Sequence, residues 1–171
     1  MKAIVAVDQN WGIGYEGDML TRIPADLARF KKMTLHKAVV MGRATFLSLP
    51  KQEPLTDRVN IVLSRNPDFT DAGVTVCPSL DALFRELKQY DTNDVFVIGG
   101  GAVYAQLLPY CTAAYVTKIG KTYPADTYFV DLDGEDGWRL VSQSEPMDYQ
   151  GIGFRYTLYE NQSPKTDGAE A

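Results

Sequence analysis

The chain has 171 residues, of which 45% are hydrophobic and 23% charged, a size and composition typical of a single domain with a substantial core. The formal net charge is −5 and no basic cluster is longer than Lys31-Lys32, which argues against nucleic acid as a partner. Every apolar run is shorter than the roughly 20 residues that a membrane helix needs, and the first run, residues 1–7, is too short for a signal peptide. We therefore expect a soluble cytoplasmic protein without a membrane partner.

Apolar, β-rich segments alternate with segments of helical periodicity through most of the chain. Strands are expected at residues 3–7, 38–41, 60–63, 74–77, 95–98 and 114–119, and helices at 24–35, 79–90 and 102–108. This alternation is typical of an α/β fold.

The last third changes to two longer alternating segments, 138–144 and 154–160, which are expected to form an antiparallel pair. The expected architecture is a central, mostly parallel mixed sheet with an antiparallel C-terminal edge and helices on both faces. Residues 1–160 are expected to form the domain, and 161–171 a disordered tail.

The cysteines and the single histidine show no sign of metal or disulfide chemistry. Cys77 and Cys111 form neither a CxxC pair nor a disulfide-rich pattern, so we expect core thiols in a reducing compartment. His36 has no second type of ligand nearby, which indicates a solvated loop residue and no metal site.

Three consecutive glycines, Gly99-Gly100-Gly101, follow the strand expected at 95–98 and precede a helix. Glycines at the carboxyl end of a strand let backbone N–H groups approach a ligand, and a helix N-terminus favours phosphate. The GxGxxG fingerprint fails because Tyr104 occupies its third glycine position. Taken alone, the triple glycine indicates either a ligand site or a tight structural turn.

Two more strand ends carry small, hydroxyl and arginine residues. Gly42, Arg43 and Thr45 follow one strand, and Ser64 and Arg65 follow the next. A single arginine is more often a solvated surface charge, but ligands of open α/β sheets gather at the carboxyl ends of strands. Because guanidinium groups suit phosphate, the repeated pattern predicts a bound polyanion, for which NADPH with its 2′-phosphate is a natural candidate.

Asp26 lies in an apolar helix segment, next to Leu27 and one turn before Phe30. It can be an N-terminal helix aspartate that the macrodipole favours. The alternative is a carboxylate inside a pocket, with a raised pKa, able to bind a protonated heterocycle or relay a proton.

Together these motifs resemble the dihydrofolate reductase family over residues 4 to about 159. The resemblance implies the three-layer fold of that family and NADPH-dependent reduction of dihydrofolate to tetrahydrofolate, with no metal. The segments that carry it are, in order, 6–8, 12–14, 23–27 with Phe30, 41–46, 58–65, 98–104, Thr117 and Asp126-Thr127.

The resemblance also implies roles for individual residues. Asp26 would be the pocket acid, with Thr117 joined to it through its hydroxyl and Thr21 available to hold a water. The implied substrate residues are Val5, Ala6, Leu27, Phe30, Leu49, Leu55, Arg58 and Ile98. The implied cofactor residues are Ala6, Ile13, Gly14, Gly42, Arg43, Ala44, Thr45, Leu63, Ser64, Arg65, Ile98, Gly99, Gly100, Gly101, Ala102, Val103, Tyr104 and Thr127. Residues 11–21 would be the mobile loop over the nicotinamide.

The sequence departs from the family pattern at two places. Leu20-Thr21 stands where most members have Pro-Trp, and Ala102 stands where some have an arginine for the 2′-phosphate. Two other functions therefore stay open beside the reductase. One is an NADPH-dependent pyrimidine reductase of riboflavin biosynthesis, and the other is a catalytically silent protein that binds NADPH or folate. A monomer is the expectation for this family.

Overall fold

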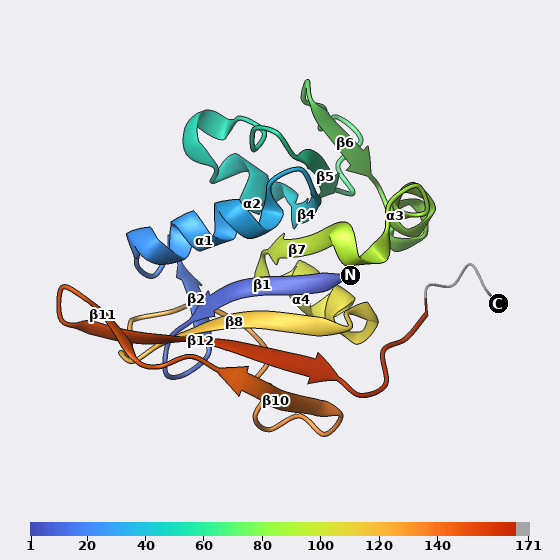
Figure 1. Ribbon diagram of the computed structural model, residues 1–171. Coiled ribbons are helices and arrows are strands. Elements are labelled where there is room, and N and C mark those ends of the chain that lie inside the picture. The colour runs from blue at the N-terminus through green and yellow to red at the C-terminus, as the bar shows by residue number, and fades with distance from the viewer. Residues whose placement is uncertain (167–171) are drawn as a thin grey trace.

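The computed structural model describes residues 1–166, and residues 167–171 of the expected tail lie outside them. A nine-stranded sheet forms the centre of the described molecule, with strand order β10-β12-β8-β1-β7-β4-β5-β6 and with β11 paired to β12 (Figure 1). Its strands are β1 (Lys2–Val7), β4 (Ala38–Gly42), β5 (Val59–Leu63), β6 (Val74–Cys77), β7 (Val95–Gly99), β8 (Ala113–Ile119), β10 (Trp138–Gln143), β11 (Met147–Tyr149) and β12 (Ile152–Asn161).

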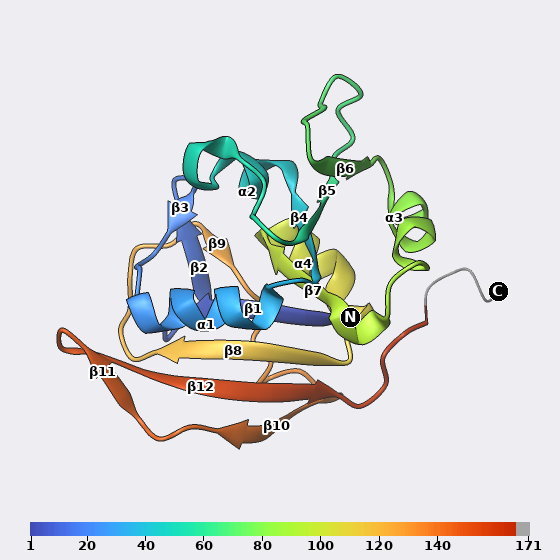
Figure 2. The same cartoon turned by 45° about the horizontal axis from the view of Figure 1, so that its top comes forward.

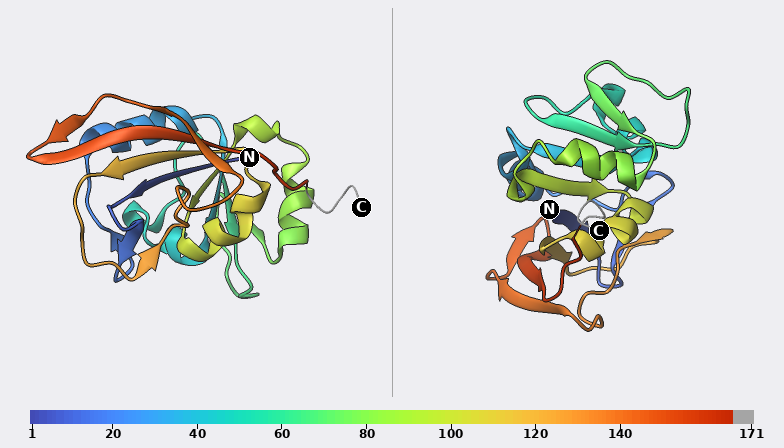
Figure 3. Two further views of the ribbon diagram at one scale, coloured as in Figure 1. Left: turned by 90° about the horizontal axis from the view of Figure 1, so that it is seen from below. Right: turned by 90° about the vertical axis from the view of Figure 1, so that its right-hand side faces the viewer.

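The helices lie on both faces of this sheet, as the sequence predicts (Figure 3). Phe30 of α1 and Phe46 of α2 belong to the apolar cluster on one face, whereas Leu83 of α3 and Leu107 of α4 belong to the cluster on the other. The helices are α1 (Pro24–Thr34), α2 (Arg43–Leu47), α3 (Leu80–Leu87) and α4 (Gly101–Leu107), with short 3-10 turns η1 (Pro50–Gln52), η2 (Thr92–Asp94) and η3 (Leu108–Tyr110).

The six strands from β8 to β6 are parallel to one another. Their central members are continuous buried runs, such as Ala38 to Met41 in β4, because helices cover both faces of a parallel sheet. The carboxyl ends of β4, β5 and β7 are neighbours in the sheet, so the three glycine- or arginine-bearing strand ends do converge.

The C-terminal edge is antiparallel, as expected: β12 pairs with β8 and with β10. The end of the chain differs from the expectation where the structure describes it. Asn161 is the last residue of β12, and the backbone N–H groups of Gln162 and Lys165 donate hydrogen bonds to the carbonyls of Gly137 and Pro109. Residues 161–165 are therefore tied to the domain by backbone hydrogen bonds.

Part of the segment 11–21, which is expected to be a mobile loop, forms two strands of a small sheet. The sheet consists of β2 (Gly12–Tyr15), β3 (Asp18–Met19) and β9 (Thr127–Tyr128), in the order β3-β2-β9 (Figure 2). Alternation is too short in these strands to be recognised in the sequence, and β9 comes from a distant part of the chain.

The remaining expectations concern single residues. Cys77 and Cys111 are buried free thiols, and His36 is exposed in a turn with a φ of 64°. Among residues 1–166 no group of three or more His, Cys, Asp or Glu side chains is arranged to hold a metal ion. In the same range, no helix combines the length and the apolar character that crossing a membrane requires.

Candidate active site

Asp26 lies in the first turn of α1, which Pro24 begins. Proline suits this position because its missing N–H would have no partner in the first turn. The Asp26 carboxylate accepts a hydrogen bond of 2.6 Å from the hydroxyl of Thr117, a buried residue of β8. Ala6 of β1 and Tyr156 of β12 are the register partners of Thr117, so all three side chains face α1.

Burial raises the pKa of Asp26, while the hydrogen bond from Thr117 and the positive charge of Arg29 act in the opposite direction. Desolvation disfavours the carboxylate and outweighs both stabilising contacts. Asp26 therefore keeps its proton to a higher pH than an ordinary aspartate, which is what the pocket interpretation of its sequence context predicts.

An apolar wall includes Phe30, which lies one helical turn after Asp26 on α1. Phe30, Leu49, Leu55 and Ile98 are partly buried and pack against one cluster that contains Phe46. The structure thus brings together four side chains from α1, the α2–β5 connection and β7. Their incomplete burial leaves apolar surface on which a flat ring can lie.

Three other predicted substrate residues are placed differently. Leu27 is 37% exposed on α1, beside Asp26 and not in the cluster. Ala6 shares the face of Thr117. Val5 packs against the cluster on the opposite face, so only its main chain can face Asp26.

Arg58 is half-buried and its guanidinium is fixed by two hydrogen bonds. Its Nε donates to the Thr56 carbonyl at 3.0 Å and its Nη1 to the Thr34 hydroxyl at 3.1 Å. Desolvation lowers the pKa of Arg58, and the charge of Asp57 opposes this. Within residues 1–166 it forms no ion pair, so the guanidinium is oriented but free to take a carboxylate.

The glycine-rich strand ends approach one another closely. A methyl group added at Gly100 would lie 3.1 Å from Oγ1 of Thr45, and one at Gly42 would lie 3.1 Å from a methyl of Val103. Gly99 has a φ of +137°, a conformation that side-chain-bearing residues rarely adopt. Gly42 at the end of β4 thus packs on α4, and Gly100 after β7 packs on α2. We call the backbone of residues 42 and 99–101 the cradle.

The small sheet closes the other side of this cradle. A methyl group added at Gly101 would lie 2.7 Å from Cγ2 of Thr127, and Gly14 is the register partner of Thr127. Next to it, Asp126 accepts a hydrogen bond of 2.9 Å from the backbone N–H of Glu16. This bond and the hydroxyl of Thr127 lower the pKa of Asp126.

The polar side chains around the cradle fit a phosphorylated dinucleotide. Arg43 and Arg65 are exposed and Ser64 is half-buried, and neither arginine is ion-paired within the part of the chain that the structure describes. Phosphate is bound by guanidinium groups and by backbone N–H groups that it can approach closely. The unpaired arginines and the neighbouring glycines offer both. The donor set therefore suits NADPH.

The other predicted cofactor residues lie in β2, β5, α2 and α4. Tyr104 is only 4% exposed, and its hydroxyl donates to the Ile4 carbonyl at 2.6 Å. Its ring packs next to Gly99 and so supports the cradle. Ile13 and Leu63 are half-buried, while Ala44 and Ala102 are exposed on the first turns of α2 and α4. Thr21 is half-buried between β3 and α1, and no hydrogen bond joins it to Asp26 in the described residues.

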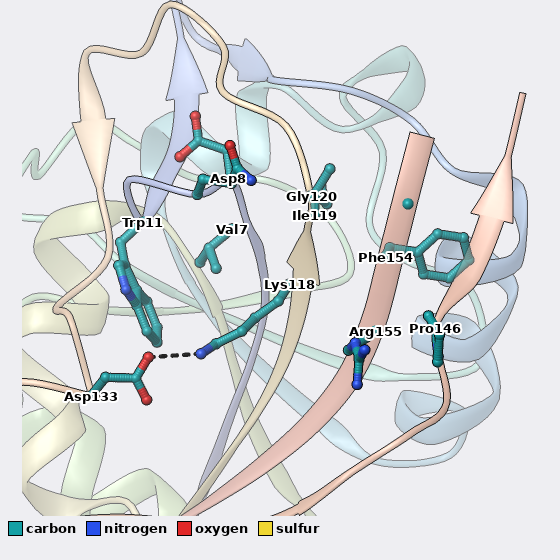
Figure 4. A pocket seen from close by; sticks show the side chains of 12 residues that line it. Val7, Asp8, Trp11, Lys118, Ile119, Gly120, Asp133, Pro146, Phe154 and Arg155 are labelled. Atoms are coloured by element: carbon teal, nitrogen blue, oxygen red, sulfur yellow. Dashed lines mark hydrogen bonds and ion pairs between the residues drawn. The ribbon is translucent and has the colours of Figure 1, made fainter. Parts of the chain in front are cut away.

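A separate hollow of about 550 Å³ lies at the carboxyl ends of β1 and β8 (Figure 4). Lys118 reaches it from the face opposite to Thr117, because successive strand residues alternate. Its ammonium group is 2.7 Å from Asp133 and 5.1 Å from the centre of the Trp11 ring. These contacts anchor Trp11, the residue before β2, and are not part of the Asp26 site.

The sequence reasoning missed two residues at the site. Arg29 lies three positions after Asp26 on α1, and its guanidinium carbon is 4.0 Å from the centre of the Tyr156 ring. The helical spacing from Asp26 was a usable signal for Arg29. The position of Tyr156 depends on the register of β12 with β8, which no local pattern gives.

An α/β domain with a half-buried acid, an apolar wall and a glycine-rich cradle at adjoining strand ends is suited to an enzyme that uses a nucleotide cofactor. The family model described as dihydrofolate reductase matches residues 1–161. The chain belongs to the dihydrofolate reductase family.

The matches with named relatives cover most of both chains. The dihydrofolate reductase of Bacillus subtilis is 36% identical, over 96% of this chain and 96% of that protein. The type 3 enzyme of Salmonella typhimurium is 42% identical, over 82% and 84%. The solved structure of the Enterococcus faecalis dihydrofolate reductase, complexed with NADP(H) and RAB-propyl, has a TM-score of 0.82 and 34% identity, covering 94% of this chain and 95% of that one.

Proposed function

We propose that the protein reduces 7,8-dihydrofolate to 5,6,7,8-tetrahydrofolate with NADPH. The observation that carries this proposal is the half-buried Asp26 carboxyl, bonded to Thr117 and bordered by the apolar wall. The class of reaction follows from the family, and the structure supplies residues suited to each part of the substrate.

Asp26 is suited to the pterin ring, because a carboxylate can accept hydrogen bonds from an amino group and a ring N–H together. Phe30, Leu49, Leu55 and Ile98 offer the flat apolar surface beside it. Arg58 supports the other end of the substrate, since its tethered guanidinium can hold a carboxylate in bidentate geometry.

The cofactor proposal rests on the cradle. Gly42 and Gly99–Gly101 would accept the backbone of the dinucleotide closely, and Arg43, Ser64 and Arg65 would hold the 2′-phosphate. Because Ala102 carries no charge, more of this task falls to the two arginines. When bound, NADPH supplies the hydride that the substrate receives at C6.

The chain's own contribution is positioning and control of a proton. Holding the two reactants in one cleft removes most of the entropic cost of their encounter. Asp26, whose pKa burial raises, would supply the proton required at N5 through a water, and the half-buried Thr21 hydroxyl would hold that water in place of the missing indole.

We also propose that the enzyme is a cytoplasmic monomer. A monomer is the state that we expect for a member of this family. Two buried free cysteines and the absence of disulfides among residues 1–166 suit a reducing compartment.

The test is NADPH oxidation by the purified protein, followed by absorbance, with dihydrofolate and with a ribitylaminopyrimidine phosphate as parallel substrates. Turnover with dihydrofolate alone supports the proposal. Turnover only with the pyrimidine would reassign the protein to the riboflavin pathway, and NADPH binding without turnover of either would make it a silent binding protein.

A further inference from the structure

Arg29 is a partly buried cation next to the pocket acid. It follows Asp26 by three residues on α1, so both side chains lie on the same face of the helix. Opposite them, Thr117 and Tyr156 are register partners on β8 and β12. These four side chains form one group between α1 and the sheet.

Two aromatic rings hold the guanidinium of Arg29. Its central carbon is 4.0 Å from the centre of the Tyr156 ring and 5.8 Å from that of the Tyr115 ring. A cation at such distances is attracted to the ring face. Within residues 1–166 Arg29 is in no ion pair, so its charge is not cancelled by a contacting carboxylate.

The surroundings contain few other charges. The rings near Arg29 are Tyr115 of β8 and Tyr156 of β12, and the ammonium of Lys2 of β1 lies 5.9 Å from the Tyr115 ring. Arg58 approaches the other end of α1, where it donates a hydrogen bond to Thr34. Tyr123 and Tyr149 pack against the same apolar cluster as Tyr156. Lys118 and Arg155 are register partners, so both point to the opposite face.

We propose that Arg29 is a positioning residue for the reaction: held on the Tyr156 ring, it is a fixed positive charge on the same face of α1 as the Asp26 carboxyl. This inference rests on the proposed function. The positive charge of Arg29 acts against the rise that burial causes in the pKa of Asp26, and it also acts against the rise in the pKa of Tyr156.

The sign of the effect follows directly. Burial raises the pKa of Asp26 and the charge of Arg29 lowers it. Without that charge the pKa rises further, so Asp26 keeps its proton to a higher pH in the variant. If a proton on Asp26 is required for hydride transfer, the loss of rate on the alkaline side must then begin at a higher pH.

The experiment is the pH profile of single-turnover hydride transfer at saturating NADPH and dihydrofolate, for the wild type, R29Q and R29K. We expect the alkaline fall in rate to occur at a higher pH in R29Q than in the wild type. At a fixed pH within that fall, R29Q should therefore be roughly threefold or more faster than the wild type. R29K keeps the charge and should follow the wild type more closely. K2Q is the matched control, since it removes a cation from the Tyr115 ring without touching Asp26.

A second measurement does not depend on turnover. In ¹³C-labelled free enzyme, the Asp26 carboxyl resonance should titrate at higher pH in R29Q than in the wild type, and Y156L, which removes the ring that holds Arg29, should shift it in the same direction. Y156F keeps the ring and should resemble the wild type.

The outcomes separate the two proposals. A wild type that does not turn over dihydrofolate at any pH overturns the proposed function. An active wild type whose profile and carboxyl titration are unchanged in R29Q overturns the role of Arg29 alone.

Discussion

The carboxylate of Asp26 and the hydroxyl of Thr117 are separated by 91 residues in the sequence and by 2.6 Å in the fold. The bond joins α1 to the middle of β8, next to the parallel strand β1. The position of Asp26 therefore depends on how α1 packs on the sheet, and the site needs both α1 and β8 in place.

Thr117→Val should weaken substrate binding. The substitution keeps the shape but removes a hydrogen bond to a charged group, which is worth about 1.5–3 kcal/mol. We expect the KM for dihydrofolate to rise roughly tenfold or more, with the pKa of Asp26 rising further because its carboxylate loses a donor. Steady-state kinetics measure this. T117S, which keeps a hydroxyl, should retain most of the affinity, and equal losses in both variants would contradict the role of the bond.

Arg65→Gln and Arg43→Gln should reduce the preference for NADPH over NADH. Each removes a guanidinium assigned to the 2′-phosphate, a group that NADH lacks. We expect the KM for NADPH to rise about tenfold in each variant and the KM for NADH to change little. A matched loss for both cofactors would show that these arginines act elsewhere.

Gly101→Ala should damage cofactor binding specifically. The added methyl group would lie 2.7 Å from Cγ2 of Thr127, so the Thr127 side chain, α4 or the small sheet must shift. Overpacking a site typically costs about 1–3 kcal/mol. We therefore expect the NADPH Kd, measured by fluorescence titration, to increase by about tenfold. The control is G134A, whose methyl group would approach no atom closer than 3.8 Å and should change neither affinity nor stability.

Much of this arrangement could be predicted from the sequence. The strand-and-helix alternation predicts the mixed sheet, and the residues of the triple glycine and the two arginine-bearing strand ends do converge, because parallel neighbouring strands end at the same edge. The role of Asp26 was undecided from its own segment, since a first-turn aspartate on a helix has an ordinary explanation.

What the sequence left open depends on contacts between distant segments. The pairing of β2 with β9 in the small sheet and the stacking of Arg29 on Tyr156 are set by register across more than a hundred residues. Local periodicity contains no information about such partners. The same is true of the hydrogen bonds that tie down residues 161–165.

Asp26→Asn should stabilise the free protein at neutral pH. The pKa of Asp26 is raised in the folded state, so its contribution to stability is present below the pKa of the unfolded chain and is lost as the pH rises through the folded value. The amide carries no charge to desolvate. Urea unfolding should therefore give D26N a higher free energy of unfolding than the wild type at neutral pH, with the difference disappearing in acid. A D26N protein less stable at neutral pH would contradict the assigned burial.

The most direct test of the site is the turnover of D26N with dihydrofolate and NADPH. The amide keeps the shape of the side chain but cannot give or take the proton, so we expect kcat/KM to fall by about 100-fold or more. The Kd for NADPH should stay within about twofold, since no cradle residue changes. Wild-type turnover in D26N, or loss of NADPH binding in place of turnover, would contradict the assignment of Asp26 as the acid of this enzyme.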